Sequence, residues 1–186
     1  MARVSAATGR VDEAVELYRQ AILRVPQPEW VTALGDLYAL SGDAAAARLQ
    51  YDTVEAIGRL SSLNQRLYNR PLAIFYADHD RNSEEALLLA ESELTVRGDL
   101  YGYDAYGWAL YRNGRFLEAR EASDQALSLR TKDARLLYHA GLISAALGEK
   151  DRAVAELGEA LQLSPAFDPL LAPHARMVLS RLEGRP

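Results

Sequence analysis

The chain has 186 residues, with 21 lysines and arginines against 26 aspartates and glutamates, and no cysteine. The net charge of −5 argues against nucleic acid as the main partner, because phosphate binding needs clustered cations. The absence of cysteine removes disulfides, thiol nucleophiles and cysteine-ligated metals, and a hydrophobic content of 49% is typical of a folded globular chain.

Apolar segments are short throughout the chain. Residues 1–10 contain no apolar stretch of signal-peptide length, and charged residues interrupt every later run before the ~18 residues of a membrane span. We therefore expect a soluble chain with no membrane insertion. The compartment stays open, with the cytoplasm slightly favoured.

The first predicted elements lie in residues 1–26. Ala14, Tyr18 and Ala21 fall on one face at helical spacing, and Pro26 ends that helix. Because only eight residues precede Gly9, we interpret this segment as a partial repeat. Two explanations stay open: the chain is part of a longer array, which we favour, or this end pairs with another copy.

Residues 28–59 predict a complete unit of two helices. Gly35 lies seven positions before Gly42, and Ala47 follows five positions later, a spacing that returns further along the chain. Tyr38 and Tyr51 add aromatic side chains near these small residues.

Residues 66–98 predict a degenerate copy of the same unit. Asp80 stands where the other units have glycine, and Ala86 follows with one extra residue in between. Pro71 indicates a kink or a late helix start, because proline lacks the amide that a helix interior needs.

Two further units, residues 100–132 and 134–167, show the period most clearly. Each of four small residues returns after 34 positions, and each unit predicts two helices separated by a glycine. The recurring pairs are Gly107 and Gly141, Gly114 and Gly148, Ala119 and Ala153, and Ala126 and Ala160. Residues 169–183 carry an i, i+3, i+4, i+7 apolar face that predicts a C-terminal capping helix.

Close helix approach gives these small residues a physical role. Antiparallel helices packed at ~8–10 Å accommodate glycine or alanine at the point of contact. The facing pairs would be Gly35 with Ala47, Gly107 with Ala119 and Gly141 with Ala153, and Gly9 and Ala14 hold the corresponding positions of the partial unit. No alternating β-branched run predicts a strand, so we expect an all-α chain of roughly eleven helices.

The chain resembles the tetratricopeptide repeat (TPR) family, whose 34-residue unit is a helix–turn–helix with small residues at the helix crossing. The resemblance covers about residues 2–165 and implies an α-solenoid of antiparallel helix pairs, a TPR-like right-handed superhelix forming a single array over residues 1–186. Arg59 and Thr131 depart from the pattern, since the family places a closing proline at these positions.

Catalytic and metal sites need convergent side chains, but His79, His139 and His174 belong to different units. Asp78, His79 and Asp80 form one local cluster, yet adjacent residues on a helix do not share a face. Nucleophile motifs and phosphate-binding loops are missing from the sequence. We expect no enzyme activity, no metal and no cofactor.

Partner binding is the stronger hypothesis, because the resemblance implies that the first helix of each unit lines a concave groove. Tyrosine, tryptophan and arginine dominate interface energetics. The residues that would face a partner are Asp36, Arg70, Tyr101, Asp104, Trp108, Tyr111, Arg112, Arg135, Tyr138 and His139. Packing of Trp108 or Tyr111 between neighbouring repeats stays open as the alternative.

TPR domains that clamp the acidic C-termini of chaperones use lysine, asparagine and arginine at fixed groove positions. Here these positions hold residues such as Thr32, Asp36, Arg70, Asp104 and Arg135, so that clamp is incomplete. The mixed groove suits instead a peptide or helix with apolar anchors and some charge.

We therefore expect a protein–protein interaction scaffold that presents a preformed concave surface to a protein or peptide of unknown identity. One alternative is a structural module that self-assembles into dimers or filaments through its N-terminal face. The other is a regulatory TPR segment of a larger protein.

Overall fold

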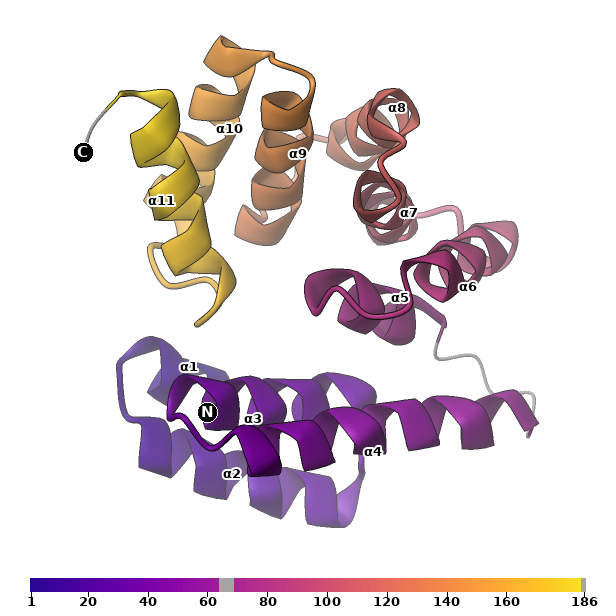
Figure 1. The fold of residues 1–186 in the computed structure, drawn as a ribbon, viewed down its shortest axis with the longest axis vertical. Coiled ribbons are helices and arrows are strands. Elements are labelled where there is room, and N and C mark those ends of the chain that lie inside the picture. Colours follow the sequence, from indigo (N-terminus) through magenta and orange to yellow (C-terminus); the bar gives the residue numbers. More distant parts are fainter. Residues whose placement is uncertain (64–68, 185–186) are drawn as a thin grey trace.

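The computed structural model describes residues 1–63 and 69–184. This part of the chain contains eleven α-helices and no strand (Figure 1). The helices are α1 (Ala2–Ala7), α2 (Val11–Arg24), α3 (Pro28–Leu40), α4 (Ala44–Leu63), α5 (Asn69–Asp78), α6 (Ser83–Val96), α7 (Leu100–Arg112), α8 (Phe116–Leu127), α9 (Ala134–Ala146), α10 (Lys150–Leu163) and α11 (Leu171–Leu182). The expected α-solenoid is therefore confirmed, whereas residues 66–68, where the expected third unit begins, lie outside the described residues.

Helices pack as consecutive pairs, α1 with α2, α3 with α4, and so on to α9 with α10, and α11 packs on α10. The first helices of successive pairs also touch, because α5 contacts α3 and α7, and α7 contacts α9. Figure 1 shows the pairs following a strongly curved course, with α1–α4 in one arm and α9–α11 in the other. This curvature brings the two arms to face each other.

A left-handed backbone residue separates the two helices of most pairs. Gly42, Gly114 and Gly148 have φ of 84°, 74° and 76°, a conformation that glycine adopts without the steric cost of a Cβ atom. Asp80 holds the same position between α5 and α6, with φ of 52°. The degenerate unit therefore keeps the turn geometry with an aspartate in place of glycine.

Helix contacts at the glycines differ slightly from the expected pairing. A Cβ atom on Gly35 would lie 2.6 Å from the ring of Tyr51, and one on Gly141 would lie 2.6 Å from Leu157 Cγ. These neighbours are one helical turn beyond Ala47 and Ala153, because side chains lean toward the N-terminal end of their helix. At Gly107 the nearest atom belongs to Ala119 itself, its carbonyl oxygen at 3.2 Å. The alanines at these positions are fully or almost fully buried: Ala14, Ala47, Ala119 and Ala153.

The contact between α3–α4 and α5 depends on a small separate core. Val31, Val54, Leu72 and Phe75 form it, all of them buried. Pro71 is the third residue of α5, a first-turn position at which its missing amide costs no helical hydrogen bond. This junction places α5 directly beside α3, and the candidate site lies at this place.

Candidate interaction site on the inner face

A hollow of about 420 Å³ lies between the two arms of the curved array. Its walls come from α1, α2, α3 and α5 on one side, and from the start of α9 and the α10–α11 connection on the other. Both aromatic and carboxylate side chains line it. Trp30, Phe75 and Phe167 supply rings, and Asp36, Asp78 and Asp168 supply carboxylates.

Helical spacing explains why α3 and α5 present these side chains. Glu29, Thr32, Ala33 and Asp36 stand at positions i, i+3, i+4 and i+7 and therefore lie on one face of α3. Arg70, Ile74 and Asp78 likewise share one face of α5 and also line the hollow.

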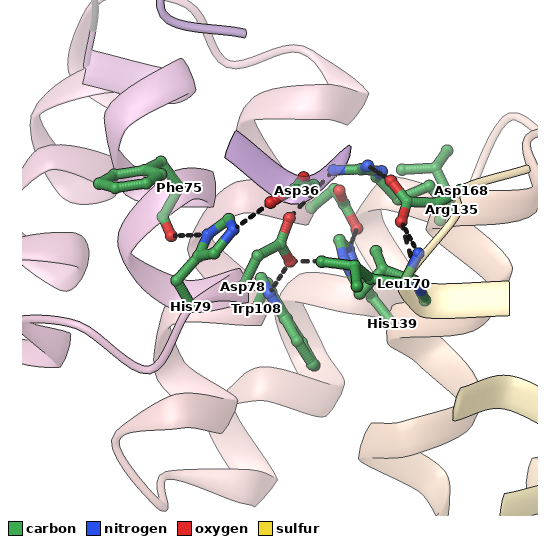
Figure 2. Close-up of polar contacts among 12 residues, drawn as sticks. Asp36, Phe75, Asp78, His79, Trp108, Arg135, His139, Asp168 and Leu170 are labelled. Atoms are coloured by element: carbon green, nitrogen blue, oxygen red, sulfur yellow. Dashed lines mark hydrogen bonds and ion pairs between the residues drawn. The ribbon is translucent and has the colours of Figure 1, made fainter. Parts of the chain in front are cut away.

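His79 links α5 to α3 beside the hollow (Figure 2). Its Nε2 lies 2.7 Å from Asp36 Oδ1, and its Nδ1 lies 2.8 Å from the carbonyl oxygen of Phe75. Both partners accept hydrogen bonds, so only the doubly protonated ring can donate to the two of them at once. Burial disfavours the charged ring, but the hydrogen bond and charge of Asp36 outweigh it and raise the His79 pKa.

Tyr51 completes this link from α4. Its hydroxyl donates to the same Asp36 oxygen at 2.9 Å, and its ring contacts His79 at a centroid distance of 4.6 Å. Burial is the main cause that raises the Tyr51 pKa, with the Asp36 charge adding to it. Asp36 therefore joins three consecutive helices, α3, α4 and α5.

Asp78, the last residue of α5, links α5 to α7 and α9 (Figure 2). Trp108 on α7 donates its Nε1–H to Asp78 Oδ1 at 2.9 Å, and Arg135 on α9 donates to Asp78 Oδ2 at 3.1 Å. Arg135 also donates to Asp168 at 2.6 Å in the α10–α11 connection. Burial opposes the charge of Arg135, but nearby carboxylates, Asp78 foremost, outweigh that cost and raise its pKa.

Several aromatic residues expected on the groove surface lie inside instead. Trp108 and Tyr138 are 2% exposed and His139 is 1% exposed. Trp108 stacks on His139 at a centroid distance of 4.3 Å, and His139 Nδ1 donates a hydrogen bond to Asp104 Oδ1 at 2.9 Å. Adjacent inner helices therefore enclose these rings in the free chain, which agrees with the alternative that Trp108 packs between repeats, and their contact with a partner stays a prediction.

The remaining expected groove residues occupy varied environments. Tyr101 is 44% exposed, Tyr111 is half-buried against Trp108, and Arg112 pairs with Asp80 at 2.7 Å. None of these three lines the hollow. Of the ten residues expected to contact a partner, those that do line it are Asp36, Arg70 and Arg135.

Asp168, Trp30 and Phe167 were not predicted from the sequence as site residues, and Asp78 was considered only as part of the local cluster with His79 and Asp80. Asp78 and His79 leave the end of α5 toward different partners, as adjacent helical residues must. Among the described residues, no three acidic or histidine side chains are grouped so as to hold a metal ion. No local sequence pattern marks Asp168 as a site residue, because its contact with Arg135 depends on how strongly the array curves.

Comparison with known proteins places the chain in a family. A model of the tetratricopeptide repeat matches residues 1–61 and 105–169, and the chain belongs to the tetratricopeptide repeat family. Repeats of this family generally form non-catalytic scaffolds, and the fold is consistent with a role in protein–protein interaction. Comparison with curated proteins gave no match.

Solved structures share the fold at low sequence identity. A tetratricopeptide repeat protein from Parabacteroides merdae is 17% identical, with a TM-score of 0.64 over 98% of this chain and 68% of that one. A thermophilic TPR protein in Thermus thermophilus is 21% identical, with a TM-score of 0.59 over 93% of this chain and 92% of that one. None of the helices in residues 1–63 and 69–184 combines the length and apolar character of a membrane span.

Proposed function

We propose that this chain is a protein–protein interaction scaffold without catalytic activity, and that its hollow binds a peptide or an extended segment of a partner protein. The observation that supports this most directly is the hollow itself, which residues from the inner helices of different pairs line together. Its volume of about 420 Å³ lies in the range typical of ligand pockets, roughly 300–1,000 Å³.

Preorganisation supports the same proposal. Arg135, Asp78 and Asp168 already hold α5, the start of α9 and the α10–α11 connection together, so a guest would order little of the scaffold. We retain Asp36, Arg70 and Arg135 as proposed partner contacts. For the enclosed Trp108 and Tyr138 we propose a packing role.

Filling the hollow tests the proposal. Peptides selected from a displayed library by the unmodified chain are offered to Ala33→Trp, which places an indole in the hollow, and to Ala39→Trp, which places one on an exposed position of the same helix. We expect Ala33→Trp to lose the selected peptides and Ala39→Trp to retain them, with thermal melting checked for both. Equal retention by the two variants would show that the hollow is not the binding site.

A further inference from the structure

Charge in the hollow is unbalanced. Five carboxylates and three guanidinium groups line it. The carboxylates belong to Glu29, Asp36, Asp78, Asp133 and Asp168, and the guanidinium groups belong to Arg3, Arg70 and Arg135.

Two of the three arginines are already neutralised. Arg135 pairs with Asp78 and Asp168. Arg70 pairs at 2.9 Å with both Glu93 and Asp99, two carboxylates that do not line the hollow. The charges that these arginines bring to the hollow are therefore offset by carboxylates of the chain itself.

The carboxylates that line the hollow differ in how many hydrogen bonds their oxygens accept. Asp78 and Asp168 use both of their oxygens, because Asp78 binds Trp108 and Arg135, and Asp168 binds Arg135 and two backbone amides. In contrast, Asp36 Oδ2 accepts no hydrogen bond from any described residue, since both Tyr51 and His79 donate to Oδ1.

Asp36 gives the strongest evidence for a missing donor, because the residue is only 7% exposed. A carboxylate so deep in a protein normally has donors for both oxygens. Its Oδ2 is not sealed among apolar atoms, and the residue lines the hollow, so the hollow is the side from which a donor can reach it.

Trp30 provides an apolar wall beside these acceptors. Its indole is half-buried and lines the hollow next to Glu29. Aromatic faces attract cations and pack against the aliphatic stems of arginine and lysine. An acidic guest would instead meet an excess of carboxylates.

We propose that the hollow takes a segment bearing a basic side chain, whose cation donates to Asp36 Oδ2 while its stem lies against Trp30. This inference rests on the proposed function and names the class of partner: a basic segment with apolar flanks. Arg3 opposes such a guest, because its guanidinium lines the hollow and forms no ion pair with any described residue.

Three matched peptides test the inference. The probes are acetyl-Leu-Arg-Leu-amide, the same peptide with neutral, nearly isosteric citrulline in place of arginine, and the same peptide with glutamate. Each is titrated into isotopically labelled chain while the amide resonances of Thr32 and Ala33 are followed. We expect the arginine peptide to bind about tenfold more tightly than the citrulline peptide, as one charge-assisted hydrogen bond provides. Equal affinities, or tighter binding of the glutamate peptide, would overturn the inference.

Paired variants locate the charge preference. Asp36→Asn keeps an oxygen that accepts from Tyr51 and His79, and it should abolish the discrimination between arginine and citrulline. Arg3→Gln should strengthen binding of the arginine peptide roughly twofold. Asp124→Asn removes one charge from the outer contact with Arg152 and should change neither affinity. If Asp36→Asn unfolds the chain, Glu29→Gln is tested instead. It should reduce the ratio between the affinities of the arginine and citrulline peptides, and an unchanged ratio would contradict the inference.

Failure of this inference can be told apart from failure of the proposed function. If Ala33→Trp abolishes capture of library peptides while the arginine and citrulline peptides bind equally, the hollow binds partners but has no preference for a basic side chain. If Ala33→Trp has no effect on capture, and no probe shifts the resonances of Thr32 or Ala33, both proposals fail.

Discussion

At the scale of single residues, the inner face of this array is held by shared acceptors. Asp36 receives donors from α4 and from His79 directly after α5, and Asp78 receives donors from α7 and α9, so each carboxylate fixes the relative position of three elements. Arrangements of this kind stabilise one geometry more than they add total stability, because burying a carboxylate costs free energy that its partners largely offset.

Protonation of His79 should make part of the stability depend on pH. The His79 pKa is raised in the folded chain, so folding favours the charged ring. Its contribution is therefore fully present below the unfolded pKa of about 6.5 and is lost as the pH rises through the higher folded value. We expect the difference in unfolding free energy between the unmodified chain and His79→Gln to be largest near pH 5.5–6.5 and to shrink toward pH 9.

Urea unfolding of both proteins at several pH values measures this difference. His174, whose pKa is lowered chiefly by burial, titrates in the opposite sense but is present in both proteins and cancels. A difference that grows with increasing pH would show that His79 is neutral in the folded chain.

At the scale of helices, the small residues act through particular contacts. The backbone of α9 at Gly141 lies so close to Leu157 that an added methyl group would come within 2.6 Å of its Cγ. Gly158 lies on α10 itself, yet a Cβ atom there would meet nothing within 4 Å. The two glycines therefore have opposite requirements.

Alanine substitution should separate these two cases. Gly141→Ala must displace Leu157 in a packed interface, which we expect to cost ~1–3 kcal/mol. Gly158→Ala should instead stabilise the chain by ~0.5–1 kcal/mol, because alanine loses less backbone entropy than glycine in a helix. Thermal or urea unfolding of both variants checks the signs, and a neutral Gly141→Ala would show that the helices can separate slightly without cost.

Helices and their turns could be predicted from the sequence because their signals are local. Recurrent glycines mark the turns, apolar spacing marks the helix faces, and Pro28 stands at the first turn of α3. The residue that packs against each glycine was harder to predict from the sequence than the helices and turns. The contact with Leu157 lies one turn from the alanine in the repeat pattern, since side-chain direction shifts the point of closest approach.

At the scale of the whole molecule, the candidate site depends on curvature that no local pattern encodes. Small rotations between successive pairs add up along a solenoid, and their sum decides which inner residues converge. Asp36 and Arg135 were expected on the inner face from their repeat positions, and both line the hollow. Tyr138 shares that kind of position but is enclosed, because α11 and Phe167 cover its ring.

Arg135 offers a direct test of whether this curvature is held by side chains. It is the described cation that bridges α5 and the α10–α11 connection, through Asp78 and Asp168. Arg135→Gln should leave two carboxylates close together without their shared donor. We expect this to lower the free energy of unfolding by at most ~1–3 kcal/mol, because solvent screens the charge of a partly exposed group and reduces the cost. Repulsion between them should move α5 and the α10–α11 connection apart and reduce the curvature, so we expect small-angle X-ray scattering to show a larger radius of gyration. Arg152→Gln removes the same charge from an outer contact with Asp124 and Glu156 and should leave that radius unchanged. If Arg135→Gln also leaves it unchanged, helix packing alone sets the curvature, and the bridge only fixes the shape of the hollow.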